Sequence, residues 1–498
     1  MTRLPKTLVL AAALTAAAVT LRAQEMDSSE AAVQVDRADH AFAAAHYEDA
    51  YKQYNKVFSA SRGDSAARAL KGMIRSALRL SSFLRARQEA EALNATTHDA
   101  EAVTLLGDAQ WGSGWFDEAE KTYQAARDRF PDSARARFGI ARSLATRQRL
   151  TEALAEALAA SKAAPGDPEI LVLAAELHER LGQYEEAARL YGEYVKILPG
   201  RLRNDPEVAG IKIKLLRSFA GRTPSVIDDA DRPHVVPFTM RDRKIVVRGL
   251  LNGKPLELVL DTGADRTAIT RETAAGAGIR AIVETMITGV GAPGVKTLSV
   301  GRADTLSIGD LTIHDLPVSI RRGNMPGTLA WQNETFSPAM LGLSVVVDYK
   351  RREVTMGRSV PVEPADFILP LRVYRLPFVR GLVNGKHPAS FIVDTGGEML
   401  SISKDVATQL AMRPSRHIAL RVFGVMGLDR DAFVLPGVNL DFEAIRYQNF
   451  GVAVLNLRAP SVLLGFQVGG ILGYSFLKEY RVAMDLARGE LRLTKAGP

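Results

Sequence analysis

The sequence predicts a multidomain protein in which an all-α array of helical repeats is followed by an all-β region built as two similar lobes. Three observations support this prediction. Landmark residues recur every 34 positions before residue 200, the pattern changes to alternating Val, Ile and Thr after residue 233, and one β-type segment occurs twice. At 498 residues the chain is also too long for a single hydrophobic core.

The first 23 residues have the pattern of a targeting segment. Arg3 and Lys6 give it a basic start, an apolar run follows from Thr7 to Leu21, and Ala23 offers a small residue for cleavage. The run is shorter than the roughly 20 residues that span a bilayer. We therefore expect residues 1–23 to be a secretory signal peptide, with export to the periplasm or the outside and no membrane span in the mature chain. The alternative is an uncleaved membrane anchor.

Residues 24–220 have the pattern of a helical repeat array. Small residues let paired helices approach closely, and proline ends the second helix of a pair because it lacks an N–H. The best unit, residues 106–132, resembles the tetratricopeptide repeat. We count five repeats and a capping helix over residues 205–219. The landmarks spaced by 34 residues are Ala119, Ala153 and Ala187 and, separately, Pro131, Pro165 and Pro199.

Arrays of this class bind a peptide or protein on their concave face, so we expect a protein partner there. The alternative is that the array only spaces or shields its neighbour. Lys and Arg are scattered despite a net charge of +8, and no run of five like charges occurs. Nucleic acid is therefore not an expected partner.

The β region follows a polar, turn-rich segment at residues 221–233, which we expect to be a linker. Two lobes are predicted, over residues 234–360 and 361–498. In each lobe an Asn-Gly turn between apolar runs, the strongest short hairpin signal, leads into a strand that ends in Asp-Thr-Gly. These two turns begin at Asp261 and Asp394.

Two carboxylates at equivalent points of a duplicated β unit suit the acid–base hydrolysis of an amide. About 3 Å apart they cannot both ionise, so they share one proton and together supply a base and an acid. Gly263 and Gly396 permit the tight turns, and the hydroxyls of Thr262 and Thr395 are able to tie the two loops together. Because the chain has no cysteine and no histidine pair at metal-ligand spacing, we expect no metal and no other cofactor.

The paired turns resemble the catalytic loops of retroviral-type aspartic proteases, and two such units in one chain are similar to the pepsin-like architecture. The resemblance covers about residues 235–493. It implies a two-lobed acid-protease fold in which Asp261 and Asp394 are the paired catalytic carboxylates. It also implies that Leu341-Gly342 and Leu472-Gly473 belong to the strands under the active-site loops, with a connection after the first that is shorter by about six residues.

The surroundings of the two turns carry two further expectations. Neither turn has Ser or Thr directly after its Gly, where a hydroxyl would lower the pKa of a carboxylate, so we expect the dyad to titrate higher and activity to extend towards neutral pH.

Arg248 and Arg380 begin the hairpins. They either pair with Asp265 and Glu398 or, as the favoured alternative, remain solvated.

Each lobe has a Gly-rich hairpin after its turn, at residues 288–297 and 422–433. The resemblance implies that these hairpins form flaps over a substrate; the alternative is a plain surface hairpin. The first fits Gly-x-Gly-x-x-Gly, but the alternating strands that follow it do not fit the helix of a dinucleotide site. The flap candidates are Gly289, Gly291, Gly294, Gly424 and Gly427.

Together these features predict an exported aspartic endopeptidase that activates water between Asp261 and Asp394, with the repeat array recruiting a substrate or partner. Its substrates would be peptides or proteins. The competing hypothesis is a non-catalytic peptide-binding scaffold in which the array is the functional part. A third hypothesis is a scaffold that cleaves only itself.

Overall fold

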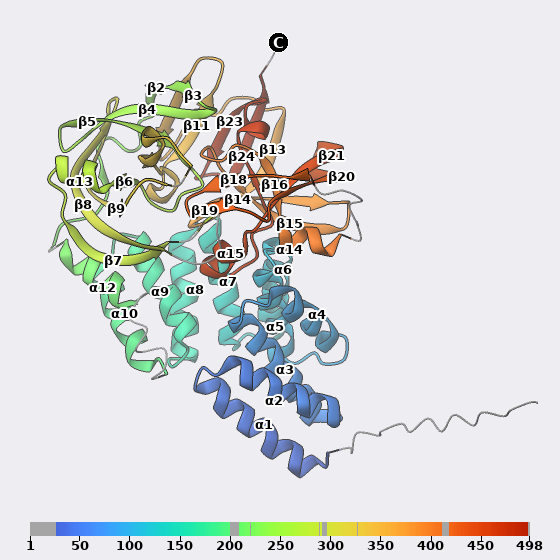
Figure 1. Ribbon diagram of the computed structural model, residues 1–498. Coiled ribbons are helices and arrows are strands. Elements are labelled where there is room, and N and C mark those ends of the chain that lie inside the picture. Colours follow the sequence, from blue (N-terminus) through green and yellow to red (C-terminus); the bar gives the residue numbers. More distant parts are fainter. Residues whose placement is uncertain are drawn as a thin grey trace, which may run out of the picture.

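The computed structural model describes residues 26–199, 209–219, 221–287, 289–290, 296–325, 327–410 and 418–496. The predicted signal peptide, residues 1–23, lies outside the described residues. Within the described ranges, no helix is both long and apolar enough to cross a membrane. An array of helices comes first in the chain and curves along one side of an all-β region (Figure 1).

The described helices of the array form five successive pairs, the number of repeats expected from the sequence. Buried tyrosines pack directly on glycines of neighbouring helices. A Cβ atom on Gly107 would lie 2.5 Å from the Tyr123 ring, so no side chain fits there. The pairs are α1 (Ser28–Ala43) with α2 (Tyr47–Ala60), α3 (Gly63–Arg79) with α4 (Phe83–Asn94), α5 (Ala100–Gly112) with α6 (Phe116–Arg129), α7 (Ala134–Thr146) with α8 (Leu150–Ala163), and α9 (Pro168–Arg180) with α10 (Tyr184–Ile197).

Helix α12 (Ala209–Ser218) follows the fifth pair and packs on α10. It lies within the segment predicted to be a capping helix; residues 205–208 of that segment are outside the described residues. The other side of α12 contributes Leu215 and Phe219, just beyond its end, to an apolar cluster shared with the first lobe. The array therefore ends against the β region.

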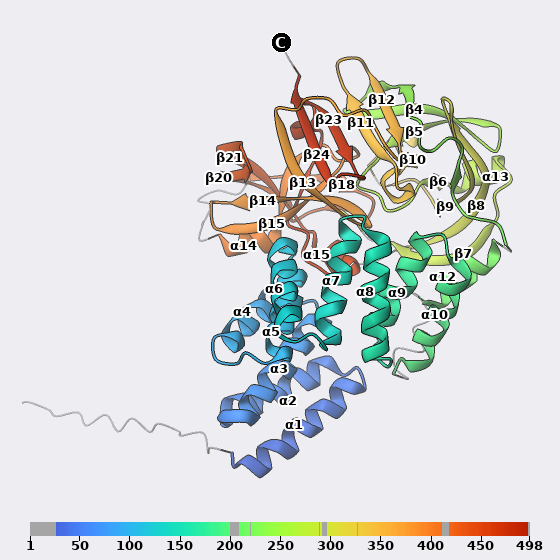
Figure 2. The ribbon, with the colours of Figure 1, turned by 180° about the vertical axis from the view of Figure 1, so that it is seen from behind.

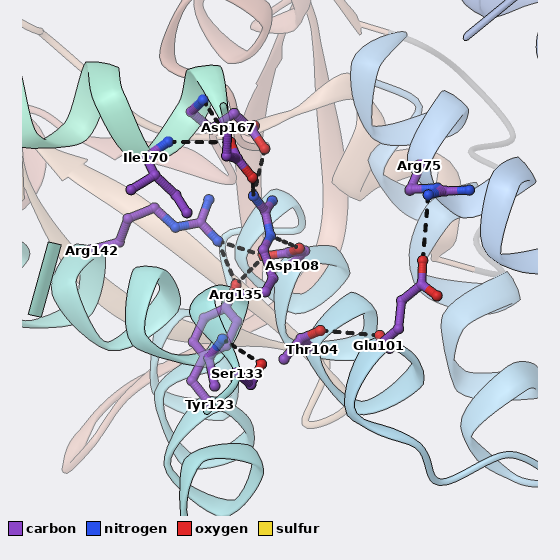
Figure 3. Close-up of polar contacts among 12 residues, drawn as sticks. Arg75, Glu101, Thr104, Asp108, Tyr123, Ser133, Arg135, Arg142, Asp167 and Ile170 are labelled. Atoms are coloured by element: carbon purple, nitrogen blue, oxygen red, sulfur yellow. Dashed lines mark hydrogen bonds and ion pairs between the residues drawn. The ribbon is translucent and has the colours of Figure 1, made fainter. Parts of the chain in front are cut away.

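A network of charged side chains joins neighbouring repeats of the array (Figure 3). The side chain of Asp108 is only 3% exposed and accepts hydrogen bonds from Tyr123 Oη at 2.6 Å, Arg135 Nε at 2.6 Å and Arg142 Nη2 at 2.8 Å. Arg135 Nη1 also donates to Glu169 Oε2 at 2.6 Å. Because these charges satisfy one another within the repeats, the network stabilises the stacking of α5, α7 and α9.

The first large sheet contains nine strands and forms most of the first lobe. Its main path runs β1-β9-β6-β10-β5-β4-β8-β7, and β3 pairs with β4 outside this path. The strands are β1 (Val226–Ile227), β3 (Thr239–Arg241), β4 (Lys244–Leu251), β5 (Lys254–Leu260), β6 (Ala268–Thr270), β7 (Ala281–Ile287), β8 (Lys296–Ile308), β9 (Leu311–Arg321) and β10 (Thr335–Phe336).

The second large sheet contains thirteen strands, in the order β17-β20-β21-β16-β22-β15-β14-β13-β24-β23-β11-β12-β2. Its end joins the two halves of the β region, because β11 pairs with β23. The strands are β2 (His234–Pro237), β11 (Ser344–Asp348), β12 (Glu353–Gly357), β13 (Phe367–Tyr374), β14 (Leu376–Val383), β15 (His387–Val393), β16 (Leu400–Ser403), β17 (Ile418–Ala419), β20 (Phe433–Phe442), β21 (Ile445–Leu455), β22 (Gly470–Leu472), β23 (Tyr480–Asp485) and β24 (Glu490–Lys495).

The two Asn-Gly hairpins predicted from the sequence are confirmed. Antiparallel strands β4 and β5 are joined at Asn252 and Gly253, and β14 and β15 at Asn384 and Gly385. All four residues have positive φ angles, from 48° to 75°. Asn and Gly tolerate this conformation, which matches the twist of the flanking strands.

The strand predicted to pass under the first turn is wrongly placed at Leu341-Gly342. In the structure that strand is β10, in which Phe336 is in parallel register with Leu260. The equivalent strand of the second lobe is β22, in which Leu472 is in parallel register with Val393. Leu341 instead ends a short 3₁₀ turn, and Gly342 adopts φ 71° to terminate it. The next strand begins eight residues after both Phe336 and Leu472, so the first connection is not shortened.

The segment expected to be a linker, residues 221–233, contributes a strand to the first lobe. Within it β1 pairs antiparallel with β9, with Val226 opposite His314. Directly after it, β2 pairs with β12 in the shared sheet. A two-residue strand among turn residues has no alternating apolar pattern, so no local signal predicts it.

The array packs against the second lobe through a buried interface beside α6 and α7 (Figure 2). Phe116 packs edge-on against Phe378 and Phe466. Arg372 on β13 has a side chain that is 6% exposed; its Nε donates to Asp117 at 3.1 Å and its Nη1 to Thr146 Oγ1 at 3.0 Å. Its Nη2 also contacts Glu120. Apolar packing and a buried cation thus connect the array to the lobe.

Arg372→Ala is expected to lower the free energy of unfolding by about 2 kcal/mol, because it removes the buried cation and leaves Asp117 and Glu120 with the more exposed Arg147 as their partner among the described residues. Arg380→Ala is the matched control. Arg380 lies across the same interface, but its side chain is 44% exposed and pairs with Glu118 alone, so its loss should cost less than about 1 kcal/mol. Denaturant unfolding of both variants measures the difference, and equal losses would contradict this description of the interface.

Candidate active site

The two predicted acidic turns occupy equivalent places in the two lobes. Asp261 follows β5 and Asp394 follows β15. The backbone N–H of Asp261 donates to the Phe336 carbonyl of β10 at 2.9 Å, and that of Asp394 donates to the Leu472 carbonyl of β22 at 3.0 Å. A parallel strand therefore fixes the start of each turn.

The threonines of the two turns hold the lobes together by reciprocal hydrogen bonds. Thr262 Oγ1 donates to the Val393 carbonyl and Thr395 Oγ1 to the Leu260 carbonyl, both at 2.7 Å. Each hydroxyl also accepts from the other threonine's backbone N–H, at 3.1 and 3.0 Å. Both side chains are almost fully buried, with 0% and 2% exposure. The two threonines that were predicted to tie the loops together thus join the lobes by four hydrogen bonds.

The glycines of the turns allow the two carboxyl groups to face each other. A Cβ atom on Gly263 would lie 2.4 Å from Asp394 Cγ, and one on Gly396 would lie 2.6 Å from Asp261 Cγ. Each carboxyl therefore lies over the glycine of the opposite turn. The same glycines donate backbone hydrogen bonds to the aspartate of their own turn, Gly263 N at 3.0 Å and Gly396 N at 2.8 Å.

The environment favours the protonated form of this carboxyl pair. Burial, followed by the charge of Asp394, raises the pKa of Asp261 to about 7. Burial also raises the pKa of Asp394 above its ordinary value. The cations Arg321 and Lys244 act in the opposite direction on the pKa of Asp261 and reduce the rise. Because the two carboxyls interact strongly, their titration belongs to the pair.

Ion pairs between the lobes flank the turns. Arg375, in the tight connection between β13 and β14, pairs with Asp265 of the first turn, and Lys244 Nζ lies 3.5 Å from Glu398 of the second. Arg248 and Arg380 do not pair with Asp265 and Glu398. Arg248 is solvated, the alternative favoured from the sequence, with its side chain 84% exposed and 3.8 Å from Glu257, whereas Arg380 pairs with Glu118 of the array.

The two Gly-rich hairpins contact each other at Gly289 and Val290 of the first and at residues 424–426 of the second. β7 and β8 flank the first hairpin, and β18 (Val422–Gly424) and β19 (Gly427–Asp429) form the second. Met426 N donates to the Val290 carbonyl at 3.1 Å, and a Cβ atom on Gly424 would lie 2.2 Å from that oxygen. Gly289 lies against Val425, and Gly427 has φ 109°. Gly291 and Gly294, the other two flap candidates, lie outside the described residues.

Sequence reasoning missed Lys244, Arg321 and Arg375, the cations around the two turns. The ion-pair partners lie far apart in the chain, so no local pattern identified them. The similarity between the lobes gave no signal for Arg321 either, because its structural equivalent in the second lobe is Leu455. Among the residues that the structure describes, no cluster of three or more His, Cys, Asp or Glu side chains is arranged to hold a metal.

Family comparison identifies both parts of the chain. The model of the aspartyl protease family matches residues 247–345 and 379–476, and that of the tetratricopeptide repeat matches residues 104–168. The chain therefore contains two copies of an aspartyl protease domain behind a tetratricopeptide repeat array. A search of the curated proteins finds no match.

Several solved structures are similar to the array. TTC0263, a thermophilic TPR protein of Thermus thermophilus, shares 20% identity over 34% of this chain and 93% of its own, with a TM-score of 0.31. YrrB, a TPR protein with an unusual peptide-binding site, shares 22% identity over 36% and 91%, with a TM-score of 0.23. MamA of Desulfovibrio magneticus RS-1 shares 13% identity over 34% and 94%, with a TM-score of 0.25.

Asp261→Asn is expected to stabilise the protein at neutral pH. The folded-state pKa of about 7 lies above the ordinary value of 3.8, so the native carboxyl favours folding fully only below about pH 4, and this contribution is lost as the pH rises through 7. The uncharged amide avoids that loss. Thermal melting should show that Asp261→Asn is more stable than the native protein at pH 8, by roughly 2–4 kcal/mol in unfolding free energy. This difference in stability should decrease towards zero at pH 4.

The control for this prediction is Asp304→Asn on β8, whose side chain is 67% exposed. It should leave the pH dependence of melting unchanged. If the gap between native protein and Asp261→Asn is the same at pH 4 and pH 8, the raised pKa is wrong.

Proposed function

We propose that the chain is an aspartic endopeptidase. The single observation that supports it is the pair of carboxyl groups, Asp261 and Asp394, that face each other across the reciprocal threonine bonds. A like-charge pair in a buried site costs stability. A protein that only binds peptides has no use for such a pair, whereas acid–base hydrolysis needs one.

In the proposed reaction the pair starts with one proton between its two carboxyls. The ionised carboxyl takes a proton from water as the oxygen attacks the scissile carbonyl carbon, and the protonated carboxyl gives its proton to the carbonyl oxygen. The C–N bond of the tetrahedral intermediate then breaks, and the departing nitrogen takes a proton from the dyad. At the same time one hydroxyl of the intermediate returns its proton to the ionised carboxyl and becomes the carbonyl of the new carboxylic acid, so that the dyad again holds one proton.

The substrate would be an extended peptide or protein segment. We propose that it lies between the dyad and the two hairpins near Val290 and Met426, where backbone groups of the hairpins would pair with it as a strand does. Val290 and Met426 contact each other in the present conformation, so binding would require the two hairpins to separate. Exclusion of water by their closure would then strengthen the electrostatics of the dyad.

For the array we propose a divided role. Its middle helices share a buried interface with the second lobe, which favours for this part the alternative that the array spaces or shields its neighbour. Tetratricopeptide arrays generally mediate protein interactions. In both ribbon views α1 and α2 lie at the end of the array farthest from the β region, so we propose this end as the place where a protein partner binds (Figures 1 and 2).

Export is a proposal that rests on the first 23 residues alone, with their basic start and apolar run. The periplasm or the cell exterior would be the destination. N-terminal sequencing of the protein recovered from each cell fraction tests it, because a cleaved signal peptide leaves a mature chain that begins near residue 24.

Cleavage of an unbiased peptide mixture between pH 3 and 8 tests the proposed activity. Asp261→Asn and Asp394→Asn are each expected to lower kcat by at least about 100-fold, because each removes one half of the acid–base pair. Asp304→Asn, an exposed aspartate of the same lobe, should leave kcat unchanged. Mass spectrometry of the products gives both the rates and the positions of cleavage.

The outcomes separate the competing functions. If only one of the two aspartates matters, the two-carboxylate mechanism is wrong. If the folded native protein cuts no peptide at any pH, the non-catalytic peptide-binding scaffold becomes the better description. If the native protein shortens only its own chain, self-cleavage is its activity.

A further inference from the structure

Arg321 lies beside the dyad on the first lobe. It is the last residue of β9 and is in parallel register with Thr270 at the end of β6. Its neighbour Ile320 belongs to the apolar core of the β region, and side chains alternate along a strand, so Arg321 extends from the opposite face. Its Nη1 donates at 2.7 Å to the carbonyl of Asn333, shortly before the strand that binds the backbone of Asp261.

The charge of Arg321 has no carboxylate partner among the described residues. Its only hydrogen-bond contacts there are the Asn333 carbonyl and the Met325 Sδ, 3.5 Å away. Its Nε is buried and forms no hydrogen bond. Burial lowers the pKa of the guanidinium, and the charges of Asp261 and Glu334 oppose this shift. A guanidinium carries five N–H donors, so most of its donors remain available.

Other arginines in similar positions do have carboxylate partners. Four further arginines bury an Nε that forms no hydrogen bond, and each of them makes an ion pair. These are Arg75 with Asp39, Arg87 with Glu91, Arg142 with Asp108 and Arg492 with Glu490. A buried cation without such a partner is costly unless something else supplies the anion. Arg321 lacks such an ion pair among the described residues, so a carboxylate of a bound ligand is able to supply it.

Glu334, an acid that acts electrostatically on Arg321, does not fill this role. Its carboxylate accepts hydrogen bonds from Thr270 N at 3.0 Å, Thr270 Oγ1 at 2.8 Å and Thr273 Oγ1 at 2.6 Å. Glu334 is therefore engaged at the start of the short helix α13 (Arg271–Gly276). Asp261 also interacts electrostatically with Arg321, but it belongs to the dyad.

The second lobe has no cation at the equivalent place. In the parallel strands of the second lobe Leu455 is in register with Ser403, as Arg321 is in register with Thr270 in the first lobe. Leu455 is 4% exposed and belongs to an apolar cluster that includes Ile471. The two sides of the dyad therefore differ in chemistry, one cationic and one apolar.

We propose that Arg321 is a specificity-determining residue that binds a carboxylate of the substrate on the first-lobe side of the scissile bond. The carboxylate comes from an Asp or Glu side chain or from the C-terminus of a substrate chain. The second-lobe side has no matching cation and accepts neutral side chains. This proposal rests on the proposed peptidase function and names the substrate class of the same site.

Paired peptides provide the test. Peptides found to be cut in the mixture are remade with each Asp or Glu replaced by its amide, and separately with an amidated C-terminus. The native protein should prefer the acidic form about tenfold or more in kcat/KM at one subsite, which is the effect of a hydrogen bond to a charged group. Arg321→Met should reduce that ratio to near one, and Arg321→Lys should retain part of it.

Because each ratio compares two peptides with one protein sample, partial unfolding of a variant does not change it. Arg302→Met, whose native side chain pairs with Asp315 elsewhere in the first lobe, is the matched control and should keep the full preference. The replacement that slows cleavage by the native protein, side-chain amide or amidated C-terminus, identifies the source of the carboxylate. A preference that survives in Arg321→Met, or that is absent from the native protein, overturns the proposal.

Two further outcomes separate this proposal from an effect of Arg321 on the dyad alone and from a failure of the proposed peptidase function. If Arg321→Met shifts the pH profile equally for acidic and neutral peptides and leaves their ratio unchanged, Arg321 acts only on the dyad and the proposal is wrong. If no peptide is cut at all, the proposed peptidase function fails. In that case capture of the same mixture on native protein and on Arg321→Met measures the preference directly: enrichment of acidic peptides by native protein alone supports the carboxylate site, and equal capture overturns it.

Discussion

The active-site region depends on the four hydrogen bonds that Thr262 and Thr395 exchange between the lobes. Two buried carboxyl groups repel each other when both ionise, so they face each other only if the surrounding backbone holds them. The threonine bonds provide this at the turns, and the pairing of β11 with β23 joins the lobes at a distance from them. The raised pKa of Asp261 follows from burial and from the charge of Asp394, and it favours the protonated form of the pair that the proposed acid–base reaction requires.

The array is connected to the same region by short paths. In the turn between β13 and β14, Tyr374 packs edge-on against Trp111 of the array at 6.1 Å, and the next residue, Arg375, pairs with Asp265 of the first acidic turn. At the C-terminal end of the array, Leu215 and Phe219 pack with Val283 and Val300 of β7 and β8, the strands that flank the first hairpin. The array thus contacts both the base and the hairpin of the candidate site, and it is placed to influence both.

The sequence was sufficient for the parts of the fold that repeat. The 34-residue period, the Asn-Gly hairpins and the duplicated Asp-Thr-Gly turns are local patterns, and they predicted the array, the two lobes and the meeting of Asp261 with Asp394. The strand under the first turn was misplaced because Thr335-Phe336-Ser337 lacks the glycine of its counterpart, and its register is set by pairing with β5. The ion pairs of Asp265 and Glu398 were not predictable, because several arginines lie near each hairpin and only the three-dimensional packing selects between them.

The pH dependence of kcat/KM between pH 3 and pH 9 tests most directly whether the two aspartates share one working proton. A dyad whose upper pKa is about 7 predicts a bell-shaped profile, with activity that extends to near-neutral pH and falls as the second carboxyl ionises above pH 7. An activity that continues to rise above pH 8, or one confined below pH 4, would contradict a shared proton held at this raised pKa.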